Sequence, residues 1–279
     1  MSTYRVSVNS LVAFTARAGD LDLRFTPAPS AIEGIAGHQI IRQRRRANYE
    51  SEVRLNGHYP GLEVSGRADG YDPDTNTLEE IKTHRSDLSR IPENQRAVHW
   101  AQAKLYGWML CQARGLSTIN IAVVYFNILS GEETSAPVCY SAKQLQSFFN
   151  LHSEKFLSWA EQETAHRERR NTSLEAMPFP HATYRTGQRD LAEKVFLAVR
   201  GEQVLLAQAT TGIGKTLATI FPQLKAIGEC KIDRLFFLTA KTPGRQLALD
   251  AIETLRLACY DLQLRVLEHV ARDKACVYP

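Results

Sequence analysis

The chain has 279 residues, a length that suggests two domains with a sizeable core. Its 44% hydrophobic and 23% charged residues are ordinary for a globular protein, and its net charge of +4 permits nucleic-acid binding without arguing for it. No apolar run approaches the roughly 18 residues of a membrane span, and the N-terminus lacks a secretory signal pattern, so we expect a cytoplasmic protein with no membrane partner.

Two amphipathic helices are expected before residue 47, separated by a break at residues 27–31 (PAPSA). The first has apolar residues at helical spacing and Gly19 as its candidate end. The second contains His38, which is either a structural histidine or a metal ligand. It ends in a basic run that either contacts phosphates or forms a solvated helix face. The run consists of Arg42, Arg44, Arg45 and Arg46.

The stretch from Gly61 to Tyr106 carries the strongest chemical signal. Two expected strands, residues 62–68 and 77–82, flank the polar turn DPDTNT and therefore form a hairpin or neighbouring strands. Glu80 and Lys82 project to the same side of their strand, and Asp69 at the end of the preceding strand can face them.

Two carboxylates on one sheet surface are costly without a cation, unless water solvates them. Carboxylate oxygens suit Mg²⁺ or Mn²⁺, which can generate hydroxide from water and polarise a phosphodiester while a lysine steadies the developing charge. The bland alternative is a solvated hairpin with a surface pair between Glu80 and Lys82.

A helix is expected over roughly residues 93–113, with Gln102 and Tyr106 four positions apart on one face. That face can look onto the metal surface, or Tyr106 can pack in the core while Gln102 faces solvent. Further strands are expected at residues 52–55, in TINIAVVYFN and in TSAPVCY, and an amphipathic helix over residues 141–166.

A helix with GxxxH, followed by GRADG, ExK and QxxxY, resembles the RecB-like branch of the PD-(D/E)xK nucleases over roughly residues 1–165. The resemblance implies an α/β fold whose nuclease core is a mixed sheet flanked by helices, acting on DNA. It implies that Mg²⁺ or Mn²⁺ binds His38, Asp69 and Glu80, assisted by the carbonyl of Ile81. It further implies that Lys82 is catalytic and that Gln102 and Tyr106 belong to the family's helical motif.

A second region follows a charged, proline-containing segment, residues 167–183, which is typical of a linker. We therefore expect domains at residues 1–166 and 184–279. In the second region a helix precedes the apolar run VLLAQA, the loop ATTGIGKT and another helix.

The order of strand, GxGKT loop and helix is the context of a phosphate-binding loop. Gly212 and Gly214, after Thr211, allow the backbone to wrap a phosphate at a helix N-terminus. Lys215 would reach the β- and γ-phosphates of ATP, and Thr216 would ligate Mg²⁺. Ala209 stands where such loops usually begin with glycine.

The surroundings of this loop resemble the DinG/XPD-like superfamily 2 DNA helicases. The resemblance implies an incomplete RecA-like P-loop domain with strands at residues 204–207 and 235–238. It implies that Gln188, assisted by Arg185, reads adenine. It also implies that Cys276 is the first of four cysteines binding an iron–sulfur cluster in a longer protein. Because the acidic ATPase motif is absent before Pro279, we expect a fragment or a truncated product with uncovered strand edges and negligible ATPase activity.

Three functions compete. The first is a metal-dependent DNA nuclease, preferably an exonuclease on single strands or ends, joined to the start of a helicase motor. The second is an ATP-driven translocase whose nuclease-like domain only grips DNA. The third is a non-catalytic DNA-binding module, which would bind in a salt-sensitive manner without cutting. DNA repair and defence are both compatible pathways, and the sequence does not indicate an oligomeric state.

Overall fold

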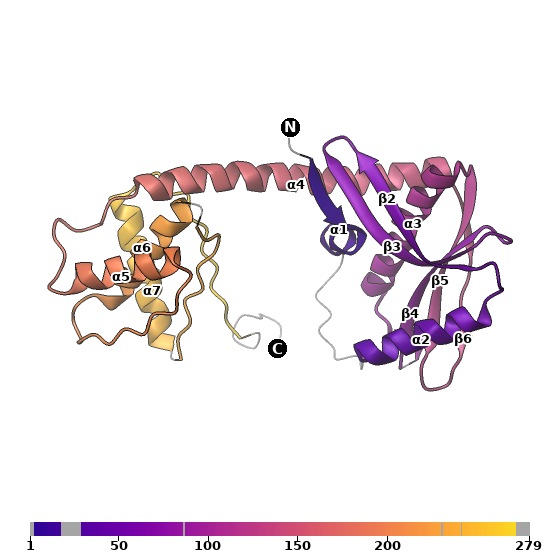
Figure 1. Cartoon of the computed structure of the whole chain (residues 1–279), viewed down its shortest axis with the longest axis horizontal. Coiled ribbons are helices and arrows are strands. Elements are labelled where there is room, and N and C mark those ends of the chain that lie inside the picture. Colours follow the sequence, from indigo (N-terminus) through magenta and orange to yellow (C-terminus); the bar gives the residue numbers. More distant parts are fainter. Residues whose placement is uncertain (1–2, 18–28, 86, 230, 241, 272–279) are drawn as a thin grey trace. The chain divides into compact units, whose positions relative to one another are not determined.

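The computed structural model describes residues 3–17, 29–85, 87–229, 231–240 and 242–271 (Figure 1). The chain divides into two compact units, Met1–Glu161 and Gln162–Pro279, which are described separately. The candidate helix end at Gly19 and the candidate cluster ligand Cys276 lie outside the described residues. No helix in the described part combines the length and the apolar character needed to cross a bilayer.

The first unit is built on a seven-stranded mixed sheet. The pairs β1–β3 and β4–β5 are parallel, whereas β2–β3, β3–β4, β5–β6 and β5–β7 are antiparallel. The expected mixed sheet is therefore confirmed, and β1 is an addition that the sequence analysis missed. The strands are β1 (Tyr4–Ser7), β2 (Glu50–Tyr59), β3 (Leu62–Asp72), β4 (Thr77–His84), β5 (Thr118–Asn127), β6 (Glu133–Thr134) and β7 (Val138–Ser141).

Helices flank this sheet. The main core joins α1 (Val8–Thr15), α3 (Glu93–Arg114) and the start of α4 (Ala142–Ala176) to alternate residues of β3, β4 and β5. A smaller core places Ile41 of α2 (Ala31–Arg44) against Ile81, Ala122 and Val124. Since alternate strand residues point to opposite faces, α2 covers the face of β4 and β5 opposite to α3. A short 3₁₀ turn, Leu88–Arg90, precedes α3.

The sheet contains a fork that positions the functional residues. On one edge β3 pairs with β2 along most of its length, from Leu62 to Tyr71. On the other edge it pairs with β1 at residues 62–65 and with β4 only at residues 70–72. The last pair with β4 is Gly70↔Glu79, after which β4 continues beside β5 alone. The strands therefore separate at Asp69 and Glu80, which lie at the first unpaired position on each side.

The basic run at the end of α2 is not a solvated helix face as a whole. Arg45 pairs with Glu79 at 2.8 Å and with Glu133, and it is largely buried. Arg44 donates to the carbonyl of Gly131 at 3.1 Å and stacks over Phe126. These two guanidiniums attach α2 to the sheet, because long side chains reach over apolar surface to distant acceptors.

The second unit contains α5 (Gln188–Arg200), α6 (Lys215–Gly228) and α7 (Thr242–Ala258). The expected linker over residues 167–183 is helical in its first part, because α4 continues to Ala176. Residues 161–170 are rich in Glu, Gln, Ala and Arg, which favour helix. Leu174 and Met177 are buried against α6 and α7, and this packing outweighs the polar composition of the segment.

The expected strands Val204–Ala207 and Leu235–Leu238 have no strand structure. Val204 and Leu206 are 94% and 95% exposed, and Leu238 is 88% exposed. A strand is held by backbone hydrogen bonds to a neighbour, and no described segment supplies one here. Apolar composition alone therefore predicted strands that the described part of the chain does not pair, and a P-loop domain with its sheet is not shown.

Candidate functional site

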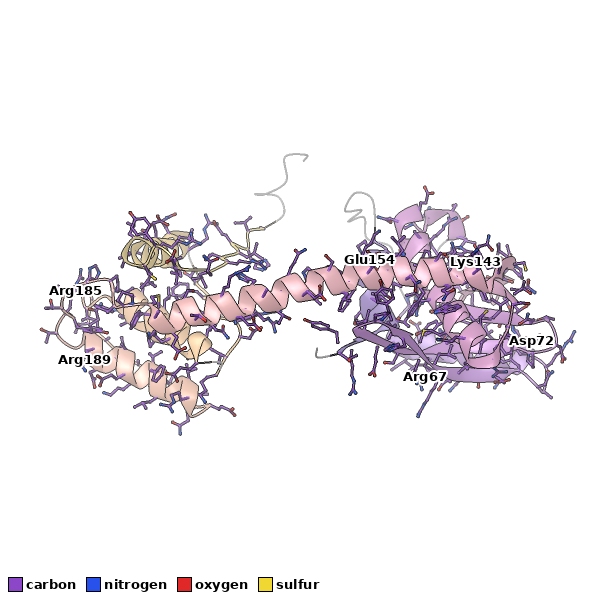
Figure 2. The ribbon with its side chains drawn as sticks, turned by 90° about the horizontal axis from the view of Figure 1, so that it is seen from above. Arg67, Asp72, Lys143, Glu154, Arg185 and Arg189 are labelled. Carbon is purple, nitrogen blue, oxygen red and sulfur yellow. The ribbon has the colours of Figure 1, made fainter. Side chains whose placement is uncertain are left out.

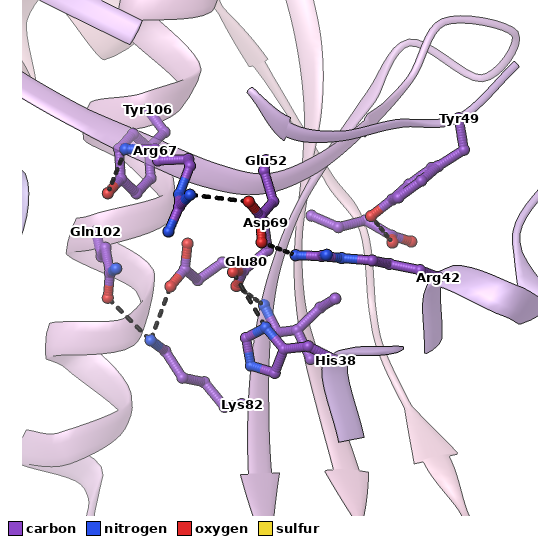
Figure 3. Close-up of polar contacts among 12 residues, drawn as sticks. His38, Arg42, Tyr49, Glu52, Arg67, Asp69, Glu80, Lys82, Gln102 and Tyr106 are labelled. Atoms are coloured by element: carbon purple, nitrogen blue, oxygen red, sulfur yellow. Dashed lines mark hydrogen bonds and ion pairs between the residues drawn. The ribbon is translucent and has the colours of Figure 1, made fainter. Parts of the chain in front are cut away.

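A cleft of about 710 Å³ opens at the fork of the sheet. Asp69, Glu80 and Lys82 line it together with Gln102 and Tyr106 of α3, and His38 of α2 lies at its other wall (Figure 3). These are the nuclease-site residues of the sequence analysis, gathered from four separate elements. The fork provides the space, since paired strands would fill the position between Asp69 and Glu80 with backbone hydrogen bonds.

The Asp69 carboxylate bridges the fork. Its Oδ2 accepts a hydrogen bond from the backbone amide of Ile81 at 2.7 Å, and its Oδ1 lies 3.2 Å from Nδ1 of His38. The Asp69 side chain thus replaces the backbone hydrogen bond that β3 would make to β4 if the two strands remained paired at this position. Because the amide and carbonyl of a strand residue point to the same edge, the Ile81 carbonyl also faces this gap.

Glu80 is buried, with 2% of its surface exposed. Its Oε1 accepts from Nζ of Lys82 at 2.7 Å, while its Oε2 has no partner among the described residues. Burial raises the pKa of this carboxyl to about 7, and the charge of Asp69 adds to the rise against the attraction of Lys82. A buried carboxylate oxygen without a donor indicates a place for a cation or a water.

Lys82 is held between two acceptors. Its ammonium donates to Glu80 and, at 3.0 Å, to Oε1 of Gln102 (Figure 3). One quarter of the side chain remains exposed, so the ammonium group keeps access to the cleft. The arrangement fixes a positive charge beside the two carboxylates and gives Gln102 the role of positioning it.

Tyr106 closes the open edge of β3. Its hydroxyl accepts a hydrogen bond from the amide of Arg67 at 3.3 Å, on the edge of β3 where neither β1 nor β4 pairs at this position. Burial and the charge of Glu80 raise the pKa of this phenol to about 12, so it stays protonated. Tyr106 is 2% exposed, which agrees with the core-packing alternative while leaving its hydroxyl part of the site.

Gly66 makes room for this tyrosine. A methyl group at residue 66 would lie 2.7 Å from the hydroxyl oxygen of Tyr106. We expect Gly66→Ala to displace the ring and to destabilise the fold by about 1–3 kcal/mol, as overpacking does. Denaturant unfolding measures this loss. Gly66→Ala should remain destabilising in the Tyr106→Phe background, because a ring carbon of residue 106 also lies 2.7 Å from the added methyl group. Full recovery of stability in that background would contradict the explanation.

Sequence reasoning missed two further cleft residues on α3. Gln95 and His99 line the cleft with Gln102 and Tyr106, and the four positions share one helix face. His99 places Nδ1 3.1 Å from the hydroxyl of Tyr125, and burial, with Lys82 adding, lowers the pKa of its imidazole to about 3. The spacing of residues 95, 99, 102 and 106, which places all four side chains on one helix face, was the available signal.

Within the described ranges no cluster of three or more His, Cys, Asp and Glu side chains is arranged to hold a metal ion. The expected donor set is therefore assembled in part: His38 contacts Asp69, whereas Glu80 contacts Lys82. Two carboxylates with open positions for water still fit Mg²⁺ or Mn²⁺, because these ions retain several waters in proteins. The bare Oε2 of Glu80 is the structural observation that favours this fit.

The phosphate-loop residues of the second unit form a tight turn before α6. Gly212 and Gly214 have φ values of 91° and 79°, in the left-handed region that glycine tolerates best. Nζ of Lys215 donates to the carbonyls of Ala209 and Thr210, each at 3.0 Å. Thr211 is exposed and Thr216 half-buried, and no hydrogen bond joins either side chain to another described loop residue.

Gln188 lies beside this loop. Its Nε2 donates to the carbonyl of Gly214 at 3.3 Å, and its Oε1 accepts from the amide of Arg185 at 3.0 Å. Arg185 in turn donates to the carbonyl of Gly212 at 2.7 Å. Both side chains therefore brace the loop carbonyls.

No protein-family model matches the chain, and no curated protein matches it either. Several solved structures match part of the chain at low similarity. SSO0001 is 21% identical with a TM-score of 0.37, the match covering 56% of this chain and 77% of that one. A candidate exonuclease from Eubacterium rectale is 16% identical with a TM-score of 0.33, covering 46% of this chain and 50% of that one.

The third structure is a phage-related exonuclease from Haemophilus somnus 129PT. It is 15% identical with a TM-score of 0.28, the match covering 55% of this chain and 83% of that one. TM-scores this low establish no chemistry for this chain.

Proposed function

We propose that the first unit is a divalent-metal-dependent deoxyribonuclease. The observation that carries the proposal is the constellation at the fork: a buried Glu80 with one bare oxygen, Asp69 across the gap, and Lys82 held at 2.7 Å from Glu80. A solvated surface hairpin would expose all three side chains. Buried charges are retained where they bind ions or perform chemistry, because burial otherwise costs stability.

Asp69 and Glu80 would hold the cation, with His38 and the carbonyl of Ile81 as candidate additional donors. Bound Mg²⁺ or Mn²⁺ supplies a hydroxide-forming water and polarises a phosphodiester. His38 orients Asp69 from the α2 side, and the Ile81 amide fixes the other oxygen of the same carboxylate. Lys82 offers its ammonium to the negative charge that develops as water attacks the phosphorus.

The test is incubation of 5′- and 3′-labelled single and double strands with Mg²⁺ or Mn²⁺, comparing the native protein with Lys82→Ala. Cleavage that requires the metal and is lost in the variant supports the proposal, and the released label reports polarity and strand preference. Cleavage that persists in EDTA would eliminate it. Metal-independent binding without cleavage would favour the DNA-gripping alternative, whether in a translocase or in a simple binding module.

A second candidate function, nucleotide binding, rests on the loop at Lys215. The loop residues stand at the N-terminus of α6, whose unpaired amides favour phosphate. Lys215 now satisfies two loop carbonyls, and a phosphate would offer its ammonium a stronger, charged acceptor. The helicase motor implied by resemblance, its ATP chemistry and its iron–sulfur cluster remain proposals for a longer protein.

We expect Lys215→Ala to weaken binding of a fluorescent ATP analogue by about tenfold or more, as loss of a charge-assisted hydrogen bond does. Lys194→Ala is the matched control, because Lys194 pairs only with Asp190 on the exposed surface of α5 among the described contacts. Equal affinity of the two variants would contradict nucleotide binding at this loop.

A further inference from the structure

Three charged residues outside the proposed catalytic set meet at the cleft wall. Arg42 donates to Oε1 of Glu52 at 2.5 Å, and Arg67 donates to Oε2 of the same carboxylate at 2.8 Å (Figure 3). All three residues line the same cleft as Asp69 and Glu80. One carboxylate thus holds two guanidiniums beside the proposed reaction centre, and we refer to these three residues as the Glu52 cluster.

The backbone of Glu52 is unusual. Its φ of 57° lies in the left-handed region, which costs energy for a residue with a Cβ. Glu52 lies opposite Asp69, and the β2–β3 ladder skips this pair, going from Ser51↔Gly70 directly to Val53↔Ala68. Such conformations persist where surrounding contacts over-determine them, and they concentrate at functional sites.

Arg42 differs from its neighbours in the basic run of α2. Arg44 and Arg45 are committed to the carbonyl of Gly131 and to Glu79 and Glu133, away from the cleft. Of the four basic residues in the run, Arg42 is the one that lines the cleft. The side chain of Arg67 is 57% exposed and lies at the surface of the first unit (Figure 2), so its guanidinium can leave Glu52 for another acceptor without crossing packed atoms.

We propose that Arg42 and Arg67 form a phosphate-binding subsite for the backbone of the substrate strand, and that Glu52 occupies this subsite in the free protein. A carboxylate between two guanidiniums accepts the same charge-assisted hydrogen bonds that a phosphate oxygen accepts. An incoming phosphodiester replaces Glu52 as the partner of the arginines and is thereby aligned next to Asp69 and Glu80. The inference rests on the proposed function in taking DNA as the ligand.

A purely structural role makes the opposite prediction. If Glu52 only ties α2 to β2 and β3, removing its charge loosens the cleft wall and weakens binding. If Glu52 competes with phosphate, removing its charge frees two arginines and strengthens binding. The sign of the change in affinity therefore separates the two roles.

The experiment measures binding of a fluorescent single-stranded DNA oligonucleotide by anisotropy in EDTA, so that no cleavage occurs. The variant is Glu52→Asn, because asparagine removes the charge and tolerates the left-handed backbone. We expect affinity to rise about two- to fivefold, the range of a partly exposed ion pair. Arg42→Gln with Arg67→Gln should weaken binding and reduce the slope of log affinity against log salt by about one to two.

Glu63→Gln is the matched control, because it removes the same charge from the exposed pair with Arg5 on β1, outside the cleft lining. Its affinity should equal that of the native protein. Thermal unfolding of every variant establishes that it is folded. Unchanged or weaker binding by folded Glu52→Asn, or an unchanged salt slope in the double arginine variant, would overturn the proposal.

The two proposals fail separately. If DNA binding depends on the two arginines but no metal-dependent cleavage occurs, the proposed nuclease activity is rejected and the phosphate subsite stands. If cleavage requires the metal but Glu52→Asn binds DNA with the affinity of the native protein, the phosphate subsite is rejected and the nuclease activity stands.

Discussion

Lys82→Ala is expected to reduce DNA cleavage about 10²- to 10³-fold, the loss seen when a positioned charge donor is removed from a transition state. The ammonium lies 2.7 Å from Glu80 and 3.0 Å from Gln102, so the folded protein fixes its position before substrate arrives. Preorganisation of this kind is the reason that a single side chain has a large effect. Single-turnover cleavage of end-labelled DNA at saturating Mg²⁺ measures the change.

Two companion variants sharpen this result. Gln102→Ala should lose only about tenfold, because Lys82 keeps its contact with Glu80 and loses one of two positioning bonds. Lys104→Ala on the same helix should cleave normally, since Lys104 stacks over Tyr140 and Phe148 and does not line the cleft. Equal activity of Lys82→Ala and Lys104→Ala would refute the catalytic role.

Between about pH 4.5 and 7, Glu80 is expected to lower the stability of the metal-free protein as the pH rises. The buried His99 and His152, whose pKa values are lowered to about 3 and about 4, act in the opposite direction. Burial raises the pKa of this carboxyl from 4.5 to about 7 in the folded state. Over that interval the Glu80 carboxyl binds more protons in the folded protein than in the unfolded chain, so this residue makes rising pH favour unfolding. The contribution is fully lost once the pH passes the folded-state pKa.

Glu80→Gln removes this component, because glutamine does not titrate. The free energy of unfolding in EDTA is measured by denaturant titration at a series of pH values. Between about pH 4.5 and 7, its slope against pH should be more positive in the variant than in the native protein. Mg²⁺ should restore stability to the native protein above pH 7, since a cation that binds the ionised carboxylate favours the folded state. Parallel pH profiles for the two proteins would contradict this explanation.

Local pattern was sufficient for much of the first unit. Alternation and the turn DPDTNT predicted the strands on both sides, which the structure extends to Leu62–Asp72 and Thr77–His84. The helix expected at residues 93–113 runs from Glu93 to Arg114, ended by Gly115 in the left-handed conformation. These elements follow from contacts within a few residues, which is why their spacing could be recognised.

The same local rules failed where distant partners decide. The segment Val204–Ala207 has the apolar composition of a strand, yet a strand exists only beside a paired backbone. The polar segment after residue 166 remains helical because Leu174 and Met177 bury themselves in the core of the second unit. Composition limits which secondary structures a segment can form, whereas strand pairing and burial decide which of them it adopts.

For the candidate site, the chain order of residues was enough to nominate Asp69, Glu80, Lys82, Gln102 and Tyr106, because residue type and strand periodicity limit which side chains can share a surface. Only the folded chain revealed that β3 and β4 part after Gly70↔Glu79, which opens the cleft and leaves one oxygen of Glu80 bare. It also brought Arg42 and Arg67 to a single carboxylate. The fork depends on which strands pair along each edge of β3, and those long-range hydrogen bonds leave no periodic trace in the sequence.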